Sequence, residues 1–406
     1  MNIIKQLFVF VTAIVFLTGC WDAKELNDIA IIAGIALDEA ENGEIMLSIQ
    51  SMNQKEFAEG ESPSNAPGVM YSLQGNSISN LMAKINNIEG RQPIFSHTRI
   101  MIISESIAKR GIKEYLDVFE RNPEFRNNLI ILIAKDSRAK DILTVTSPTH
   151  GLATLKLSKQ MDMFHKNWSG ITNVELIHFI DNLISKGRQP LMGAITLKNK
   201  SNIDDSTTNL QNIDLNQNVE LVGASIFKDD KYVGDLNLEN TRNYSWTQTT
   251  FNGTNLEVPC EENKLKEEDY TSIKVLRGKR NINTKIVNDK PIINITISGS
   301  GIIQESQCSA NLSSQDVQDE ITRKSETLVK NSVENTINFI QKEYGLDIFG
   351  FGEVVERQNY KEFKKLADNW DEHFKNAEIN VDVKMYIHSE GKQVESFITN
   401  LDEEDE

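Results

Sequence analysis

The chain has 406 residues, of which 39% are hydrophobic and 25% are charged, and its formal net charge is −16. This composition is ordinary for a globular protein, and the length allows two or three domains. The negative charge argues against binding to nucleic acid or to anionic lipid headgroups, because both would repel such a surface.

The first 20 residues have the pattern of a bacterial lipoprotein signal. Lys5 precedes an almost wholly apolar run over residues 7–17, which is too short to span a bilayer. Residues 17–20 then resemble a lipobox, a motif in which the cysteine thiol receives a diacylglyceryl group. We therefore expect residues 1–19 to be a signal peptide and Cys20 to be the lipidated first residue of the mature chain. An ordinary secretory signal with an incidental cysteine is the alternative.

Residues 20–200 predict an N-terminal region of mixed α/β type. A hairpin is expected over residues 28–52, because Asn42-Gly43 is a strong turn signal between two strand-like runs. From residue 70 to residue 186 strands alternate with amphipathic helices, which is typical of a sheet covered by helices. A further strand over residues 190–198 follows and could rejoin the hairpin.

The second half of the chain predicts a different architecture. Residues 201–218 are polar and read as a linker, and residues 219–392 are expected to form a C-terminal α+β domain. Its strands, which begin with a hairpin over residues 219–234, predict an antiparallel sheet. A long helix with one apolar stripe ends at Gly345, and it should pack on this sheet. Residues 393–406 form an acidic tail, so the chain as a whole is predicted to be a multi-domain α+β protein.

The sequence carries no signature of catalysis, of a cofactor or of a metal site. Its six histidines are scattered, and the zinc-protease, serine-hydrolase and nucleotide-binding motifs are absent. Asp371-Glu372-His373 could supply metal ligands, but the solvated face of a helix is the simpler interpretation. We therefore predict a protein that is not an enzyme and holds no cofactor.

Cys260 and Cys308 remain once Cys20 is assigned to lipid attachment. Outside the cytoplasm a disulfide between them is chemically allowed, and two free thiols are the equal alternative. Their spacing does not suggest a redox pair or a zinc site.

Two groups of residues are candidate structural or partner-contact sites. Phe349, Gly350, Phe351 and Gly352 follow the long helix, and glycines spaced by aromatic residues suit either a tight buried connector or a contact loop. Arg121, Glu124 and Arg126 lie between a helix and a buried strand. Glu124 could bridge the two arginines as a structural clamp, or the three side chains could form an interface patch.

Three blocks of sequence, in order, resemble the Ger(x)C family of spore-germination lipoproteins. They are residues 19–38 with Cys20-Trp21-Asp22, residues 95–143, and residues 346–353 followed by Trp370 and the closing strand. Together they extend over nearly the whole mature chain, and they make Trp21 and Trp370 further candidate structural or partner-contact residues. Ala23 and Ala36 depart from the family pattern without affecting the lipid site.

The resemblance implies the C subunit of a nutrient germinant receptor, attached by diacylglyceryl-cysteine to the extracytoplasmic face of the spore inner membrane. It implies an integral-membrane A subunit and a transporter-like B subunit as partners, and a non-catalytic role in receptor assembly and signalling. A lipid-anchored solute-binding protein of a transporter is the alternative, and it would need two similar α/β lobes. A tethered hydrolase would need a nucleophile or a metal motif.

Overall fold

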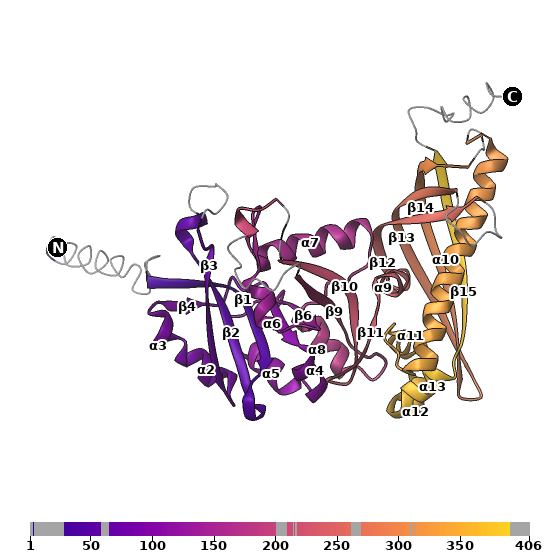
Figure 1. Cartoon of the computed structure of the whole chain (residues 1–406). Helices are drawn as coiled ribbons and strands as arrows, with labels where there is room; N and C mark the ends of the chain where they lie inside the picture. Colours follow the sequence, from indigo (N-terminus) through magenta and orange to yellow (C-terminus); the bar gives the residue numbers. More distant parts are fainter. Residues whose placement is uncertain are drawn as a thin grey trace, which may run out of the picture.

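A computed structural model describes residues 3, 28–57, 65–199, 209–213, 215, 217–260, 269–308, 311–312 and 314–389. Nearly all of the expected signal peptide, Cys20, Trp21, most of the expected linker and the acidic tail lie outside these ranges. The described chain is built on a nine-stranded sheet and a four-stranded sheet, which lie one after the other along an elongated body (Figure 1).

The nine-stranded sheet has a parallel centre flanked by antiparallel pairs. Its order is β11-β10-β9-β6-β5-β1-β2-β3, with the short β4 beside β1, and β1, β5, β6 and β9 run parallel. Continuous apolar runs form the central strands because both faces of these strands are buried. The strands are β1 (Ile29–Glu39), β2 (Ile45–Met52), β3 (Gly68–Gly75), β4 (Gln92–Ile94), β5 (Ile100–Ser104), β6 (Ile130–Lys135), β9 (Leu191–Asn199), β10 (Gln217–Lys228) and β11 (Lys231–Leu236).

Helices cover both faces of this sheet. One buried cluster joins alternate strand residues to α2, α4, α5 and α8, and a second joins the other strand face to α6 and α7. The helical stretch after β5 is divided into α4 and α5 at Gly111. The helices are α2 (Ile78–Lys84), α3 (Asn86–Glu89), α4 (Glu105–Arg110), α5 (Lys113–Arg121), α6 (Ala139–Thr144), α7 (Ala153–Asn167) and α8 (Leu176–Ile184).

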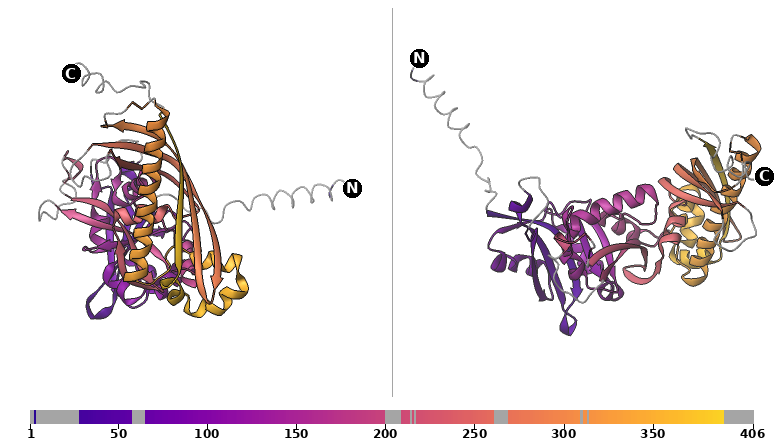
Figure 2. Two further views of the ribbon diagram at one scale, coloured as in Figure 1. Left: turned by 90° about the vertical axis from the view of Figure 1, so that its right-hand side faces the viewer. Right: turned by 45° about the horizontal axis from the view of Figure 1, so that its top comes forward.

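The four-stranded sheet has the order β12-β13-β14-β15 and carries the long helix α10 along one face (Figures 1 and 2). Val333, Ile337 and Ile340 of this helix lie in the same buried cluster as the inward-facing strand residues. The elements are α9 (Leu238–Ser245), β12 (Thr250–Pro259), β13 (Tyr270–Val287), β14 (Lys290–Ser306), α10 (Gln315–Glu343), α11 (Phe351–Gln358), α12 (Tyr360–Leu366), α13 (Trp370–Lys375) and β15 (Glu378–Ser389). The predicted multi-domain α+β class is confirmed.

Three details differ from the sequence prediction. The hairpin expected at the start of the C-terminal domain, β10 and β11, instead extends the larger sheet, because β10 pairs with β9 from Gln217–Asn199 to Ile226–Leu191. Strand β9 joins the sheet that contains the 28–52 hairpin, but it pairs with β6 and β10 rather than with the hairpin strands themselves. The smaller sheet is also not wholly antiparallel, since β15 returns through α10–α13 and runs parallel to β14.

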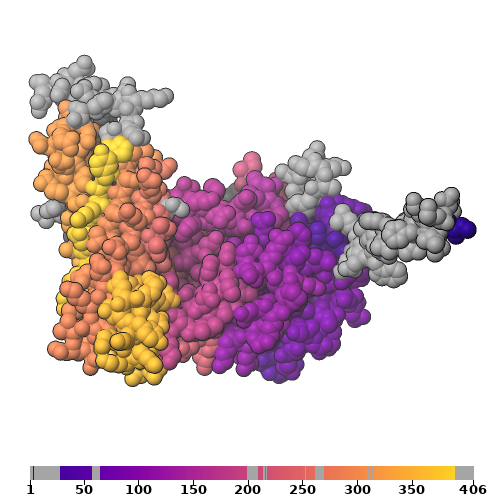
Figure 3. Space-filling model, turned by 180° about the vertical axis from the view of Figure 1, so that it is seen from behind, coloured from indigo at the N-terminus to yellow at the C-terminus, as the bar shows by residue number. Residues whose placement is uncertain are grey.

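The elongated shape separates the start of β1 from the smaller sheet. Figures 1 and 3 show the two at opposite ends of the body, with most of the larger sheet between them. In the ranges that the structure describes, no helix combines the length and the apolar character that crossing a bilayer requires.

Candidate functional site at the junction of the two sheets

A buried carboxylate organises the connection between α10 and α11. Asp347 is fully buried, and its side chain accepts five hydrogen bonds. The donors to Oδ1 are the backbone N–H groups of Phe349 (3.0 Å), Gly350 (2.9 Å) and Phe351 (3.2 Å), and the donors to Oδ2 are the N–H of Gly352 (2.8 Å) and the indole of Trp370 (2.9 Å). The carboxylate therefore satisfies the N–H groups that begin α11.

Gly350 allows the chain to wrap around this carboxylate. Its φ is +77°, a left-handed conformation that favours glycine. Burial raises the pKa of Asp347 from 3.8 to about 6, although the hydrogen bonds from Gly352 and Trp370 and the charge of Arg188 act in the opposite direction. The cost of removing the charge from water is thus only partly offset by its donors.

The aromatic residues of this connection face the core of the chain. Phe349 and Phe351 stack with ring centroids 5.1 Å apart, and Trp370 packs against Phe363 at 5.5 Å. Phe349, Phe351 and Trp370 are each at most 2% exposed. These residues, with the buried Gly350 and Gly352, shape the interior of the junction and present no side-chain surface to a partner.

Residues 187–189, between α8 and β9, dock directly onto the same connection. A Cβ on Gly187 would lie 2.5 Å from the carbonyl carbon of Gly352, so the two backbones are in close contact. The N–H of Gln189 donates to the carbonyl oxygen of Asp347 at 2.7 Å, and its side chain donates to Asp371 at 3.0 Å. Backbone contacts therefore join the larger sheet to the C-terminal domain.

Two arginines lie beside these contacts. Arg188 donates to the Tyr244 hydroxyl at 2.6 Å and to the Gln248 side chain at 3.2 Å, while its distance to the Glu353 carboxylate is 3.8 Å. Burial, followed by the charge of Arg188, lowers the pKa of Arg280 to about 10. The junction thus holds several charges of both signs in a poorly hydrated region.

The other sequence candidates lie away from the junction. Arg121, Glu124 and Arg126 are exposed, and Arg121 pairs with Asp117 at 2.8 Å. Within the described ranges Glu124 forms no ion pair, so the predicted bridge between the two arginines is wrong. The i, i+4 spacing on α5 gives Arg121 a closer partner than the next loop does.

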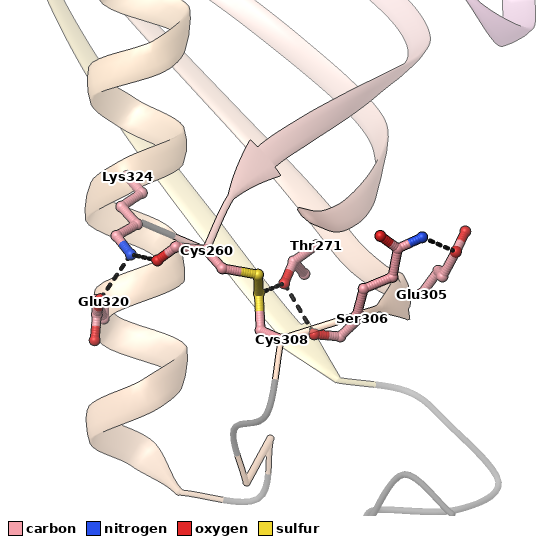
Figure 4. Close-up of a disulfide and its surroundings, with 8 residues drawn as sticks. Cys260, Thr271, Glu305, Ser306, Cys308, Glu320 and Lys324 are labelled. Carbon is pink, nitrogen blue, oxygen red and sulfur yellow. Dashed lines mark hydrogen bonds and ion pairs between the residues drawn. A yellow bond between two sulfur atoms is a disulfide. The ribbon is translucent and has the colours of Figure 1, made fainter. Parts of the chain in front are cut away.

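Cys260 and Cys308 are joined by a disulfide in the structure, with their Cα atoms 5.6 Å apart (Figure 4). The bond connects the chain after β12 to the chain after β14. Lys324 of α10 donates to the carbonyl oxygen of Cys260 and pairs with Glu320 at 2.8 Å, which ties the long helix to the same place.

The described residues offer no group of three His, Cys, Asp or Glu side chains suited to a metal ion. The candidate triplet at 371–373 is divided: Asp371 faces the junction, where burial raises its pKa, and the His373 ring lies 3.1 Å from the carbonyl oxygen of Asp289. The interpretation of this triplet as a wholly solvated helix face was wrong for Asp371.

The sequence prediction missed Asp347, Gly187 and Arg188. One signal was available for Asp347, which is a single acidic residue between the apolar Leu346 and Ile348, directly before a Gly-rich connection. Such a position suits a carboxylate that accepts backbone N–H bonds. Gly187 and Arg188 carried no comparable signal, because their roles depend on contacts with residues far along the chain, Gly352 for Gly187 and Tyr244 and Gln248 for Arg188.

Two domain families match the chain. The family described as "Spore germination protein N-terminal domain" matches residues 22–197, and the family described as "Spore germination B3/ GerAC like, C-terminal" matches residues 222–391. The first match ends within β9 and the second begins within β10, and together they cover most of the chain.

Several similar proteins and a similar solved structure agree with these matches. Spore germination protein KC of Bacillus subtilis is 24% identical, over 93% of this chain and 94% of the relative, and spore germination protein A3 of the same organism is 23% identical, over 96% and 98%. The crystal structure of the GerBC protein aligns with a TM-score of 0.56 at 18% identity, covering 87% of this chain and 96% of that one, and shows the same fold. The chain belongs to the Ger(x)C family of spore germination proteins.

Proposed function

We propose that the protein is a non-catalytic subunit of a spore germinant receptor, held by lipid on Cys20 at the extracytoplasmic face of the spore inner membrane. The observation that carries this proposal is the match of both spore germination domain families, one to residues 22–197 and one to residues 222–391. Relatives named as spore germination proteins align over nearly their full length, which supports a whole protein of this kind.

The geometry is consistent with attachment through the N-terminus. Nine residue steps separate Cys20 from Ile29, the first residue of β1, so this tether can span at most about 30 Å. The larger sheet would therefore lie near the bilayer, and the smaller sheet would lie at the far end of the body (Figure 1). Because the chain is strongly acidic, lipid rather than surface charge would supply the attachment.

The fold favours a receptor subunit over a solute-binding protein. A solute-binding protein with two similar α/β lobes would need two comparable sheets, whereas this chain joins a nine-stranded sheet to a four-stranded one. The backbone contacts of Gly187 and Gln189 also fix the two parts together, which is unlike a hinge between lobes. We propose that the protein acts in receptor assembly and signalling as one rigid body.

Co-purification tests this proposal. The full-length protein, carrying an affinity tag at its C-terminus, is extracted from spore membranes in mild detergent, and a different tagged spore lipoprotein serves as the control. We expect an integral-membrane A subunit and a transporter-like B subunit to be enriched over the control. Enrichment of transporter permease subunits instead, or of no membrane partner, would contradict the proposal.

A further inference from the structure

A cavity of about 330 Å³ lies between the two parts of the chain, next to the junction. Thr172, Arg188 and residues of α8 line it from the part built on the larger sheet, and Tyr244, Gln248 and Phe251 line it from the following segment. The volume is at the lower end of the range for small-molecule sites, and the lining combines apolar and polar side chains as such sites do. Of the residues that line this cavity, Arg188, Tyr244 and Gln248 also take part in the junction described above, and the others have been given no role.

Positive charge in the wall of this cavity is incompletely neutralised. The Arg188 side chain is 18% exposed; its hydrogen-bond partners, Tyr244 and Gln248, are neutral, and the carboxylate of its ion-pair partner, Glu353, lies 3.8 Å away. Among the described residues, its Nε has no hydrogen-bond partner, and the same is true of Nε in the neighbouring Arg280. Buried charges in proteins are normally paired, and Arg188 lines the cavity whereas Arg280 does not, so the open position of Arg188 offers a place for a further negative group.

A second polar atom in the wall also lacks a partner. Thr172 is 8% exposed, and within the described part of the chain its hydroxyl is buried without a hydrogen bond. Leaving such a group unpaired costs free energy that a ligand could recover. The acidic residue of the lining is Asp181, which is exposed on α8, and His165 and His178 are the remaining ionisable residues.

We propose that this cavity binds a small anion that carries a carboxylate, with the charge of Arg188 as the main attraction and the Thr172 hydroxyl as a hydrogen-bonding group. A guanidinium favours carboxylate partners, and a partly buried site strengthens the attraction. Because both parts of the chain line the cavity, an occupant would hold them together and stabilise the folded state.

A larger cavity of about 860 Å³ serves as an internal comparison. Lys198 in its lining pairs with Glu220 at 2.6 Å, and Arg242 resembles Arg188, since it lies 3.7 Å from Glu239 and its Nε has no hydrogen-bond partner among the described residues. The described lining of this larger cavity holds no buried, unpaired hydroxyl like that of Thr172, so Ser332 in its lining is a suitable position for a control substitution.

The test uses the full-length protein purified in detergent, without its proposed partner subunits, so it is independent of the receptor assignment. Thermal unfolding and titration calorimetry are measured with sodium acetate, with sodium phosphate, and with sodium chloride at matched ionic strength. We expect acetate to raise the unfolding temperature in a saturable way, and to do so more than phosphate or chloride.

Substitutions locate the binding. Thr172→Val removes an unpaired hydroxyl, so the fold should persist while acetate affinity falls about tenfold, and Arg188→Lys should lower the affinity further if that variant folds. Ser332→Ala should bind acetate like the wild type. The proposal is overturned if acetate acts no differently from chloride, if phosphate binds more tightly than acetate, or if Thr172→Val binds acetate like the wild type.

Discussion

Asp347 is a buried carboxylate whose oxygens accept hydrogen bonds from the surrounding backbone. Three N–H groups point at one of its oxygens, and one N–H group and the Trp370 indole point at the other. Both oxygens must therefore be acceptors. This requirement separates aspartate from its near-isostere asparagine, whose amide nitrogen can only donate.

We predict that Asp347→Asn lowers the free energy of unfolding by about 2–4 kcal/mol, because the amide leaves buried donors at one side without an acceptor. Chemical denaturation at neutral pH measures the change. Asp368→Asn is the matched control, since Asp368 is exposed and pairs with the exposed Lys186, and it should leave the denaturation midpoint unchanged. Equal stability of Asp347→Asn and the wild type would show that the five donors do not require a carboxylate.

The raised pKa of Asp347 gives a second prediction, on pH. The folded pKa of about 6 exceeds the ordinary value of 3.8, so the folded state binds more protons between about pH 4 and pH 6. The contribution of Asp347 to stability is therefore complete below pH 4 and is lost as the pH rises through 6, by roughly 2–3 kcal/mol. Denaturation curves at several pH values should show the difference between the wild type and Asp347→Asn shrinking from pH 4.5 to pH 7. A difference that is constant with pH would refute the titration of this residue.

At the scale of elements, the segment 187–189 fixes how the larger sheet meets the α10–α11 connection. Gly187 approaches Gly352 so closely that an added Cβ would lie within 2.6 Å of two backbone atoms. Backbone atoms cannot move aside as the end of a side chain can, and the segment is also held by Gln189. The junction therefore tolerates no side chain at this position.

Gly187→Ala should accordingly cost about 2–3 kcal/mol of unfolding free energy, through separation of the two segments. Gly75→Ala is a matched control, because the nearest atom to its added Cβ is the end of the Leu81 side chain at 3.3 Å. The control should cost less than about 1 kcal/mol. Equally small losses in the two variants, measured by urea denaturation, would mean that the close contact at Gly187 is unimportant.

The disulfide between Cys260 and Cys308 acts on the elements of the smaller sheet. It closes a loop across 48 residues that contains β13 and β14, and its loss should lower the unfolding free energy by about 2–4 kcal/mol. Reduction of the folded protein, followed by denaturation, measures this loss. The Cys260→Ala/Cys308→Ala chain should unfold identically with and without reductant. Two thiols that react with a maleimide in the protein isolated from spores would contradict the prediction.

The elements that the sequence predicted well are those whose signal is local. Helix α10 follows from its long apolar stripe, and the hairpin β1–β2 follows from Asn42-Gly43. The placement of β10 and β11 could not be predicted in this way, because a hairpin pattern does not reveal which sheet edge it joins. The candidate site shows the same limit: the Phe-Gly connection was identified, but Asp347 and its contact with residues 187–189 depend on tertiary packing.

At the scale of the whole molecule, the two sheets form one elongated body, with the start of β1 at one end and the smaller sheet at the other (Figures 1 and 3). The backbone contacts at the junction give this body a fixed shape, so a movement of the end that holds β1 would be transmitted to the smaller sheet. In our account, lipid on Cys20 sets the position of the body, and the rest of the chain contributes binding surfaces rather than chemistry.

Membrane fractionation of the wild type and of Cys20→Ala tests this account most directly. Both chains are produced without the proposed partner subunits, so that only lipid can retain them, and thermal unfolding checks that the fold is the same. We predict that the wild type sediments with membranes and is released by detergent but not by high salt, whereas Cys20→Ala remains in the supernatant. Sedimentation of Cys20→Ala with membranes to the same extent as the wild type would contradict the account.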